Sequence, residues 1–222
     1  MASQVCTFFS MSLLLFLTYA HYVNGGGPQF SYLGPSGPKR WGSLSPTYST
    51  CSNGVFRLNG KNYSLVQMHW HSPSEHHLDG VRYDVELHLV HKSVDGEVSV
   101  IAVLYHYGHP DPLLSKIQTK LAQLGKMVHK SSHEQAQIVI GTITTKQIRK
   151  HSRKYYRYVG SFSTPPCTQG VIWNILGKVR SISREQVSAL KEPLIFGCKS
   201  NSRPVQPLNG RKIEMFDDEM SH

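Results

Sequence analysis

Short apolar runs and apolar–polar alternation cover most of the chain after residue 60, and both patterns are typical of β-strands. Six runs rich in Val, Ile and aromatic residues predict strands at 63–71, 83–91, 98–107, 138–144, 155–160 and 171–179. Helical spacing is rarer, and it predicts one helix over 113–124 and a short capped helix that begins at Ser183 and runs through Leu190. The pattern therefore predicts a mainly β fold with a few short surface helices.

The chain has 222 residues, a length that favours one domain with a hydrophobic core of its own. Its first twenty residues carry no charge and contain an apolar run over 11–17 that ends at Thr18-Tyr19-Ala20. We interpret residues 1–20 as a secretory signal peptide and 21–222 as a single domain. A membrane anchor is the alternative because a basic n-region is missing, but the run is too short to span a bilayer. We expect no stable membrane anchor.

Export would place the protein outside the cell or in an endomembrane lumen, where cysteines tend to pair. Cys6 would leave with the signal peptide, so Cys51, Cys167 and Cys198 would remain, and their odd number leaves one thiol without a partner in the monomer. The triplet Asn62-Tyr63-Ser64 matches the acceptor pattern for N-glycosylation.

The formal net charge of +10 is the feature that could indicate a nucleic-acid partner. Six cations crowd one segment together with two tyrosines: Lys146, Arg149, Lys150, Arg153, Lys154 and Arg157. Export and the absence of a nucleic-acid-binding motif favour a solvated basic face instead. We expect no nucleic-acid partner, and the sequence gives no indication of oligomeric state.

The sequences His69-Trp70-His71 and Glu86-Leu87-His88 carry the strongest chemical signal. Alternate residues of a strand share a face, so two neighbouring strands could offer three imidazoles to one metal ion. Most single histidines are ordinary surface or core residues, and the chain has 13 of them. The metal interpretation gains weight because Gln67 and Glu86 each precede a histidine by two residues, where an oxygen could orient the ring. Three histidines without cysteine leave a fourth zinc position open, which is typical of catalytic sites.

Three longer motifs extend this signal, at 67–76 (QMHWHSPSEH), 86–91 (ELHLVH) and 160–167 (GSFSTPPC). Together they resemble the α-class carbonic anhydrases, most closely the secreted plant type, and the likeness runs from Trp41-Gly42 past Arg203-Pro204 to Asn209. The resemblance implies a twisted, mostly antiparallel central sheet with a zinc ion. It also implies reversible hydration of carbon dioxide to bicarbonate and a proton, so the expected partner is a small-molecule substrate.

The resemblance also assigns roles to single residues. It implies that His69, His71 and His88 bind Zn²⁺ and that Gln67 and Glu86 orient these rings. Ser163 and Glu75 would be catalytic, with the serine hydroxyl orienting hydroxide while it donates a hydrogen bond to the glutamate. The wall of the carbon dioxide binding site, called the substrate wall below, would consist of Val90, Val103, Phe162, Thr164 and Trp173. The disulfide of secreted members would join Cys51 to Cys167, and Cys198 has no counterpart.

The sequence departs from the family pattern in two places. A block of dozens of residues, which normally includes sheet strands and the proton-shuttle histidine, is missing between about residues 54 and 55. Phe162 stands where efficient members carry leucine. Both departures predict slower turnover than in an intact enzyme. Two alternatives stay open: a non-catalytic storage or zinc-binding relative, and a splice isoform that does not fold.

Overall fold

The structure is a computed structural model, and it describes residues 55–130, 138, 140, 154–194 and 198–217. The expected signal peptide, Cys51 and most of the predicted strand at 138–144 lie outside these residues.

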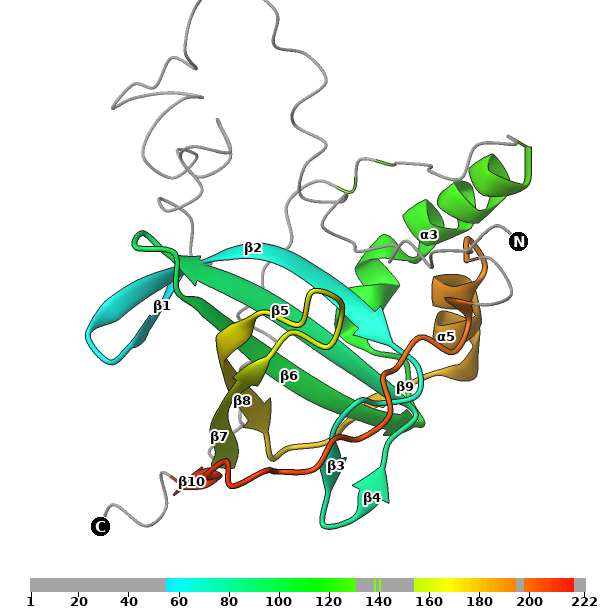
Figure 1. Cartoon of the computed structure of the whole chain (residues 1–222). Helices are drawn as coiled ribbons and strands as arrows, with labels where there is room; N and C mark the ends of the chain where they lie inside the picture. Colours follow the sequence, from blue (N-terminus) through cyan, green and yellow to red (C-terminus); the bar gives the residue numbers. More distant parts are fainter. Residues whose placement is uncertain (1–54, 131–137, 139, 141–153, 195–197, 218–222) are drawn as a thin grey trace, which may run out of the picture.

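A mixed eight-stranded sheet forms the centre of the fold (Figure 1). Its order is β1-β2-β5-β6-β8-β7-β10, and β9 pairs separately with β6. The strands are β1 (Val55–Leu58), β2 (Lys61–His71), β5 (Val85–Ser93), β6 (Val98–Tyr107), β7 (Lys154–Ser161), β8 (Gln169–Leu176), β9 (Arg180–Ile182) and β10 (Glu214–Asp217). Strands β3 (His77–Leu78) and β4 (Val81–Arg82) form a separate hairpin. All pairings are antiparallel except those of β6 with β8 and β9, which confirms the predicted mostly antiparallel, mainly β architecture.

Both faces of the central strands are covered, which explains why β5 and β6 read as nearly continuous apolar runs. One face presents Leu87 and Leu89 of β5 to a core that includes apolar residues of both helices. The opposite face carries His88 and Val90, and a second apolar cluster with Trp173 of β8 covers it. The sheet thus separates a helix-covered core from the face that carries the histidines.

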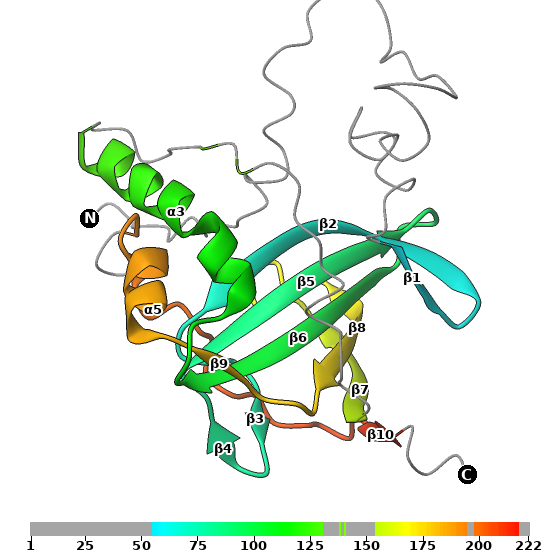
Figure 2. The same ribbon diagram turned by 180° about the vertical axis from the view of Figure 1, so that it is seen from behind.

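Two helices, α3 (Pro112–Lys130) and α5 (Arg184–Lys191), lie on the same side of the sheet (Figures 1 and 2). Helix α3 is longer than predicted, and it begins where the Asp111 carboxylate accepts hydrogen bonds from the backbone N–H groups of Leu113 and Leu114. Helix α5 begins at the predicted cap, since the Ser183 hydroxyl and the Gln186 side chain bond reciprocally to each other's backbone. Within the described ranges, no helix has the length and apolar character required to span a bilayer.

Part of the basic segment contributes to packing at the β7–β10 edge. The guanidinium of Arg157 lies 5.3 Å from the ring centre of Tyr155 and 4.7 Å from that of Phe216, and it donates to the amide oxygen of Asn174 at 2.9 Å. Such cation–aromatic contacts stabilise an edge strand pair. Arg157 is therefore a packing residue rather than part of a fully solvated basic face.

Candidate metal centre

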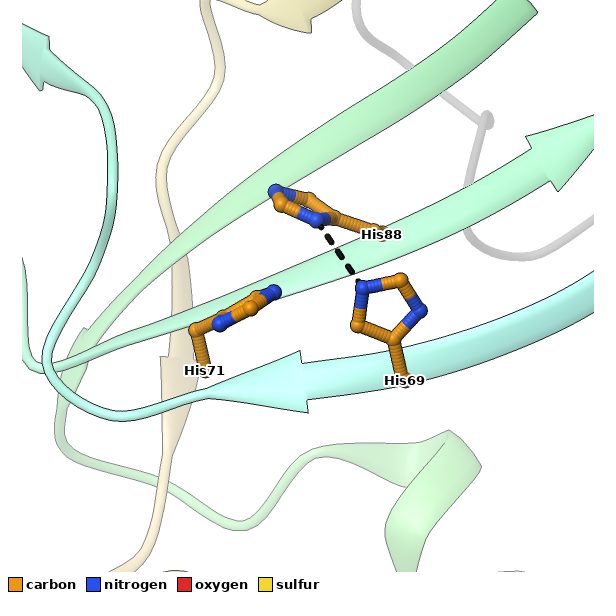
Figure 3. A group of neighbouring side chains, drawn as sticks. All are labelled: His69, His71 and His88. Carbon is orange, nitrogen blue, oxygen red and sulfur yellow. Dashed lines mark hydrogen bonds between the residues drawn. The ribbon is translucent and has the colours of Figure 1, made fainter. Parts of the chain in front are cut away.

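Three histidine side chains converge from two neighbouring strands (Figure 3). His69 and His71 belong to β2, and His88 of β5 lies directly opposite His69 in the antiparallel register. The ring centroids are 4.6 to 5.0 Å apart. One nitrogen of each ring lies within 4.8 Å of the other two, so a single ion could contact all three. The predicted cluster is therefore formed by the fold.

In each ring, the nitrogen that faces away from the common centre hydrogen-bonds an oxygen that can only accept. The ring N–H groups donate from His69 to Gln67 Oε1 (2.9 Å), from His71 to the Asn201 carbonyl (3.0 Å) and from His88 to Glu86 Oε1 (2.7 Å). In a neutral imidazole the opposite nitrogen then carries the lone pair. The lone pairs are those of His69 Nε2, His71 Nε2 and His88 Nδ1, the atoms that face the common centre.

These nitrogens fit a zinc ion. His69 Nε2 and His88 Nδ1 lie 3.2 Å apart, and two nitrogens bound to tetrahedral zinc at about 2.0–2.1 Å would be about 3.3 Å apart. The Nε2 atom of His71 is buried and makes no hydrogen bond within the described residues. Within the same part of the chain, the cluster contains no fourth protein ligand, as in catalytic rather than structural zinc sites.

The electrostatics of the cluster favour the neutral rings that metals require. Burial lowers the pKa of His69 well below its ordinary value, and the neighbouring rings of His88 and His71 lower it further. The pKa of His71 is also lowered, first by burial and then by His88. Both rings are therefore neutral at pH 7 and ready to coordinate without releasing a proton.

The fully buried carboxylate of Glu86 holds part of the cluster in place through hydrogen bonds. Its Oε1 accepts from His88 and from His76 Nδ1 (2.6 Å), and its Oε2 accepts the backbone N–H groups of Glu75 and His76 at 2.8 Å each. Burial alone would raise the pKa of Glu86, but His76 and His88 hold it well below its usual range. Burial alone would likewise lower the pKa of His76, but the charge of Glu86 raises it.

His76, Glu86 and His88 form a second group of metal-capable side chains. Their contacts of 2.6 and 2.7 Å are hydrogen bonds, and they are shorter than the separation of two ligand atoms on one zinc. Nε2 of His76 also hydrogen-bonds the Tyr158 hydroxyl at 2.7 Å. The group is therefore a hydrogen-bonded support for His88, and the triad is the better candidate for a metal centre.

The predicted catalytic pair, Ser163 and Glu75, is not hydrogen-bonded in the structure. The Glu75 Oε1 atom accepts the backbone N–H of Arg203 at 2.8 Å and lies 3.6 Å from Nδ1 of His71. The hydroxyl of Ser163 makes no hydrogen bond to any residue that the structure describes. Glu75 thus lies beside the histidine triad, whereas its contact with Ser163 and its catalytic role stay predictions.

The predicted substrate wall is only partly assembled. Val90 and Trp173 belong to the apolar cluster on the histidine face, Phe162 packs against it, and the edge of Trp173 contacts the ring of His88 at a centroid distance of 4.8 Å. Thr164 lies half-buried in the loop after β7, where its carbonyl accepts the N–H of Cys167 at 2.8 Å.

Val103 does not belong to this wall, and the prediction for it is wrong. The β5–β6 register pairs it with Leu87, so its side chain faces the helix-covered core. Val100, which pairs with Val90, belongs to the cluster on the histidine face instead. A valine-rich strand does not reveal from sequence which valines face the site, because the register decides it.

The expected disulfide between Cys51 and Cys167 is not present. Cys167 is a free, half-buried cysteine, in a turn where its own φ is +58°. Cys198, by contrast, is buried and disulfide-bonded. Cys51 lies outside the described residues. The family resemblance therefore did not predict the state of Cys167.

Asn62, the predicted glycosylation site, lies exposed on β2 opposite Arg57 of β1. This position agrees with a surface attachment, and the glycan stays a prediction.

Four residues that contact the site were not singled out by sequence reasoning: His76, Tyr158, Asn201 and Arg203. His76 ends the motif that carries Glu75, so its position was a usable signal. The other three reach the site only through tertiary packing.

A family model described as eukaryotic-type carbonic anhydrase matches residues 43–216. The chain belongs to the α-carbonic anhydrase family. It is 43% identical over 164 residues to alpha carbonic anhydrase 4 of Arabidopsis thaliana, and this match covers 74% of the chain. The same match covers only 58% of that relative, so the chain spans less than two thirds of its length.

A second relative, dioscorin DB3S of Dioscorea polystachya, is 30% identical over 258 aligned residues, which cover 93% of the chain and 92% of the relative. The alignment is longer than the 222 residues of this chain, as a relative with additional internal residues would produce. The solved structure of a dioscorin complexed with ascorbate superposes with a TM-score of 0.68 at 30% identity, covering 85% of this chain and 98% of that one. The missing segment between about residues 54 and 55 stays a prediction.

Proposed function

We propose that this protein binds one zinc ion and reversibly hydrates carbon dioxide to bicarbonate and a proton. The observation that carries the proposal is the convergence of three imidazole nitrogens, each on a ring oriented by a hydrogen bond on its other side. Zinc held by three neutral ligands acts as a Lewis acid and lowers the pKa of bound water to about 7.

The residues around the triad have distinct tasks in this proposal. His69, His71 and His88 bind the ion, while Gln67 and Glu86 fix two of the rings. The Arg203 N–H holds Glu75 through Oε1, and Glu75 Oε2 makes no hydrogen bond within the described residues. We infer that this second oxygen accepts the Ser163 hydroxyl in the working site, so that Ser163 can orient the nucleophile.

The substrate side of the site is apolar. Val90, Phe162 and Trp173 would offer carbon dioxide a surface without hydrogen-bonding groups, apart from the Trp173 indole N–H, which donates to the Ser161 carbonyl at 3.1 Å. An apolar wall beside a polar centre places a nonpolar substrate next to the nucleophile and excludes competing water. Without the family's shuttle segment, the proton would leave to buffer.

The test is to purify the protein, determine bound zinc per molecule, and measure carbon dioxide hydration with and without a sulfonamide. One zinc per chain with inhibitable turnover is expected, and turnover should rise with buffer concentration because buffer must carry the proton. One zinc per chain without turnover would contradict catalysis, and a soluble, folded protein that takes up no zinc would contradict the metal site as well.

Phe162→Leu should raise the rate constant for carbon dioxide hydration. Phe162 packs against the cluster that contains Val90 and Trp173. A smaller side chain at this position leaves more space for carbon dioxide beside that cluster. Stopped-flow hydration assays on zinc-loaded protein would measure the change. Leu78→Ala is a suitable control, because Leu78 also packs against this cluster but belongs to the β3–β4 hairpin. An unchanged rate in Phe162→Leu would contradict a wall function for this ring.

A second candidate function is a non-catalytic storage or zinc-binding protein. The alignment with dioscorin DB3S covers 92% of that relative, and dioscorin-type relatives suggest a storage role. The intact triad favours the enzyme, because storage alone requires no oriented ligands. Bound zinc without turnover in the assay above would favour this second candidate.

A further inference from the structure

Strand β10 (Glu214–Asp217) forms one edge of the central sheet, beyond β7 (Figures 1 and 2). It pairs with β7 on one side, and no described strand pairs with it on the other side. The backbone N–H and C=O groups along such an edge can pair with a further strand, which is why edges usually carry charges, bulges or proline. The outer edge of β10 is therefore a position where another polypeptide could add to the sheet.

Apolar side chains are exposed on this edge strand and on the segment that leads to it. Ile213, which directly precedes β10, and Met215 are 47% and 48% exposed, and Val205 and Leu208 earlier in the segment are exposed as well. Alternate residues of an extended chain share a face, so Ile213 and Met215 point to the same side of the sheet. Large apolar side chains on an unpaired edge indicate an interaction surface.

The occupant that fits this edge is a second copy of the chain. Two identical edge strands can pair antiparallel about a two-fold axis perpendicular to the sheet. Such an axis leaves every side chain on its own face, so each residue must pair with one that lies an even number of positions away from it. A pairing centred on Glu214 meets this condition and uses all of β10. It also stops short of the Asn209-Gly210 turn, whose φ angles of +50° and +77° do not belong to a strand.

Two copies are complementary in this register. Ile213 of each copy lies opposite Met215 of the other, so four apolar side chains would meet on one face of the joined sheet. Arg211 lies opposite Asp217 of the second copy, which places opposite charges at both ends of this apolar centre. The neighbouring symmetric registers lose these matches. A pairing centred on Met215 sets Ile213 against Asp217, and one centred on Ile213 sets Arg211 against Met215.

The other face of the pairing carries Lys212 and Glu214. The two Glu214 carboxylates would face each other at the axis, and like charges in this position repel. Nζ of Lys212, however, lies 3.0 Å from Oε1 of Glu214 in the same copy, and the register also makes Lys212 a diagonal neighbour of Glu214 in the second copy. Two cations would thus flank the two carboxylates and offset their repulsion.

We propose that β10 is a self-association edge, at which two copies of the protein join antiparallel through residues 211–217 with Ile213 and Met215 at the centre of the interface. The sheet would then continue from one copy into the other. Strands β6, β8 and β7 separate β10 from the strands that carry the histidine triad, so the interface does not overlap the metal centre. The inference therefore does not depend on the proposed function.

Sedimentation velocity of the zinc-free protein over a range of concentrations tests this interface. Wild type should pass from the mass of one chain to that of two as its concentration rises. Met215→Lys places a charge in the apolar centre and should keep the mass of one chain. Val94→Lys is the matched control, because Val94 is 98% exposed in the turn between β5 and β6, and it should dimerise as wild type does. A wild type that stays monomeric, or a Met215→Lys protein that dimerises like wild type, would overturn the proposal.

Amide hydrogen exchange in wild type tests the same interface without a variant, should Met215→Lys fail to fold. Exchange within residues 213–217 should slow as the protein concentration rises, because the dimer adds hydrogen bonds along this edge. The amides of α5 (Arg184–Lys191) should exchange at the same rate at every concentration and serve as the internal control. Exchange at 213–217 that does not depend on concentration would overturn the proposal. Slow exchange of this kind would indicate that another segment of the same chain covers the edge.

Discussion

His88→Ala is expected to lower zinc affinity by more than about 100-fold, the upper end of what removal of an outer partner costs. The variant removes one of the three nitrogens that face the common centre. Two imidazoles on β2 would remain, and Glu86 would keep its bonds to His76 and to the backbone. The substitution should therefore weaken zinc binding more than it destabilises the fold.

Competition with a chromophoric chelator would measure the affinity, and thermal unfolding with and without zinc would report it independently. A ligand that binds only the folded state stabilises it by about 2.7 kcal/mol at a hundred times its Kd. Zinc should therefore raise the unfolding temperature of wild type but not that of His88→Ala. His109→Ala, which removes an exposed histidine, is the control and should behave as wild type. A zinc-induced shift retained in His88→Ala would contradict the assigned ligand set.

Glu86→Ala is expected to reduce the free energy of unfolding of the metal-free protein by about 3–5 kcal/mol, the cost of breaking a buried ion pair. The carboxylate is fully buried and accepts four hydrogen bonds, two of them from backbone N–H groups. Its removal would leave these donors buried without an acceptor. Since total stability is typically about 5–15 kcal/mol, the effect would be a large part of it.

Urea unfolding at neutral pH would measure the loss, and Glu86→Gln would separate charge from shape because glutamine fills the same space. Glu97→Ala is the matched control. The Glu97 carboxylate accepts hydrogen bonds from the side chains of Lys61 and Tyr63, but it is exposed to solvent. Its removal should cost about 0–1 kcal/mol, as for an exposed pair. An equal loss of unfolding free energy in Glu86→Ala and Glu97→Ala would show that burial of Glu86 does not determine how much it stabilises the protein.

Local sequence patterns were sufficient for the centre of the fold but not for its edges. The apolar runs predicted β2, β5 and β6 because these strands are long, and β5 and β6 are also covered on both faces. Strands β1 and β10 have four residues each and were missed, since so short a run carries no period.

The site shows the same division. Spacing predicted the triad because His69 and His71 alternate within one strand, and family resemblance supplied Glu75 beside it. The sequence could not decide between Val100 and Val103, because the facing side depends on the register of β6 against β5. Nor could it find Asn201, whose role arises from a contact across 130 residues.

That long separation has a consequence for how the protein is made. Every proposed zinc ligand has left the ribosome once residue 88 is exposed, yet the carbonyl that orients His71 belongs to residue 201. Contacts between residues so distant in sequence form late in folding, because the intervening chain must close a large loop first. A nascent chain would therefore contain all three histidines before the carbonyl that orients His71 has been synthesised. A chain truncated before residue 201 would keep the three histidines but lack this hydrogen-bond acceptor.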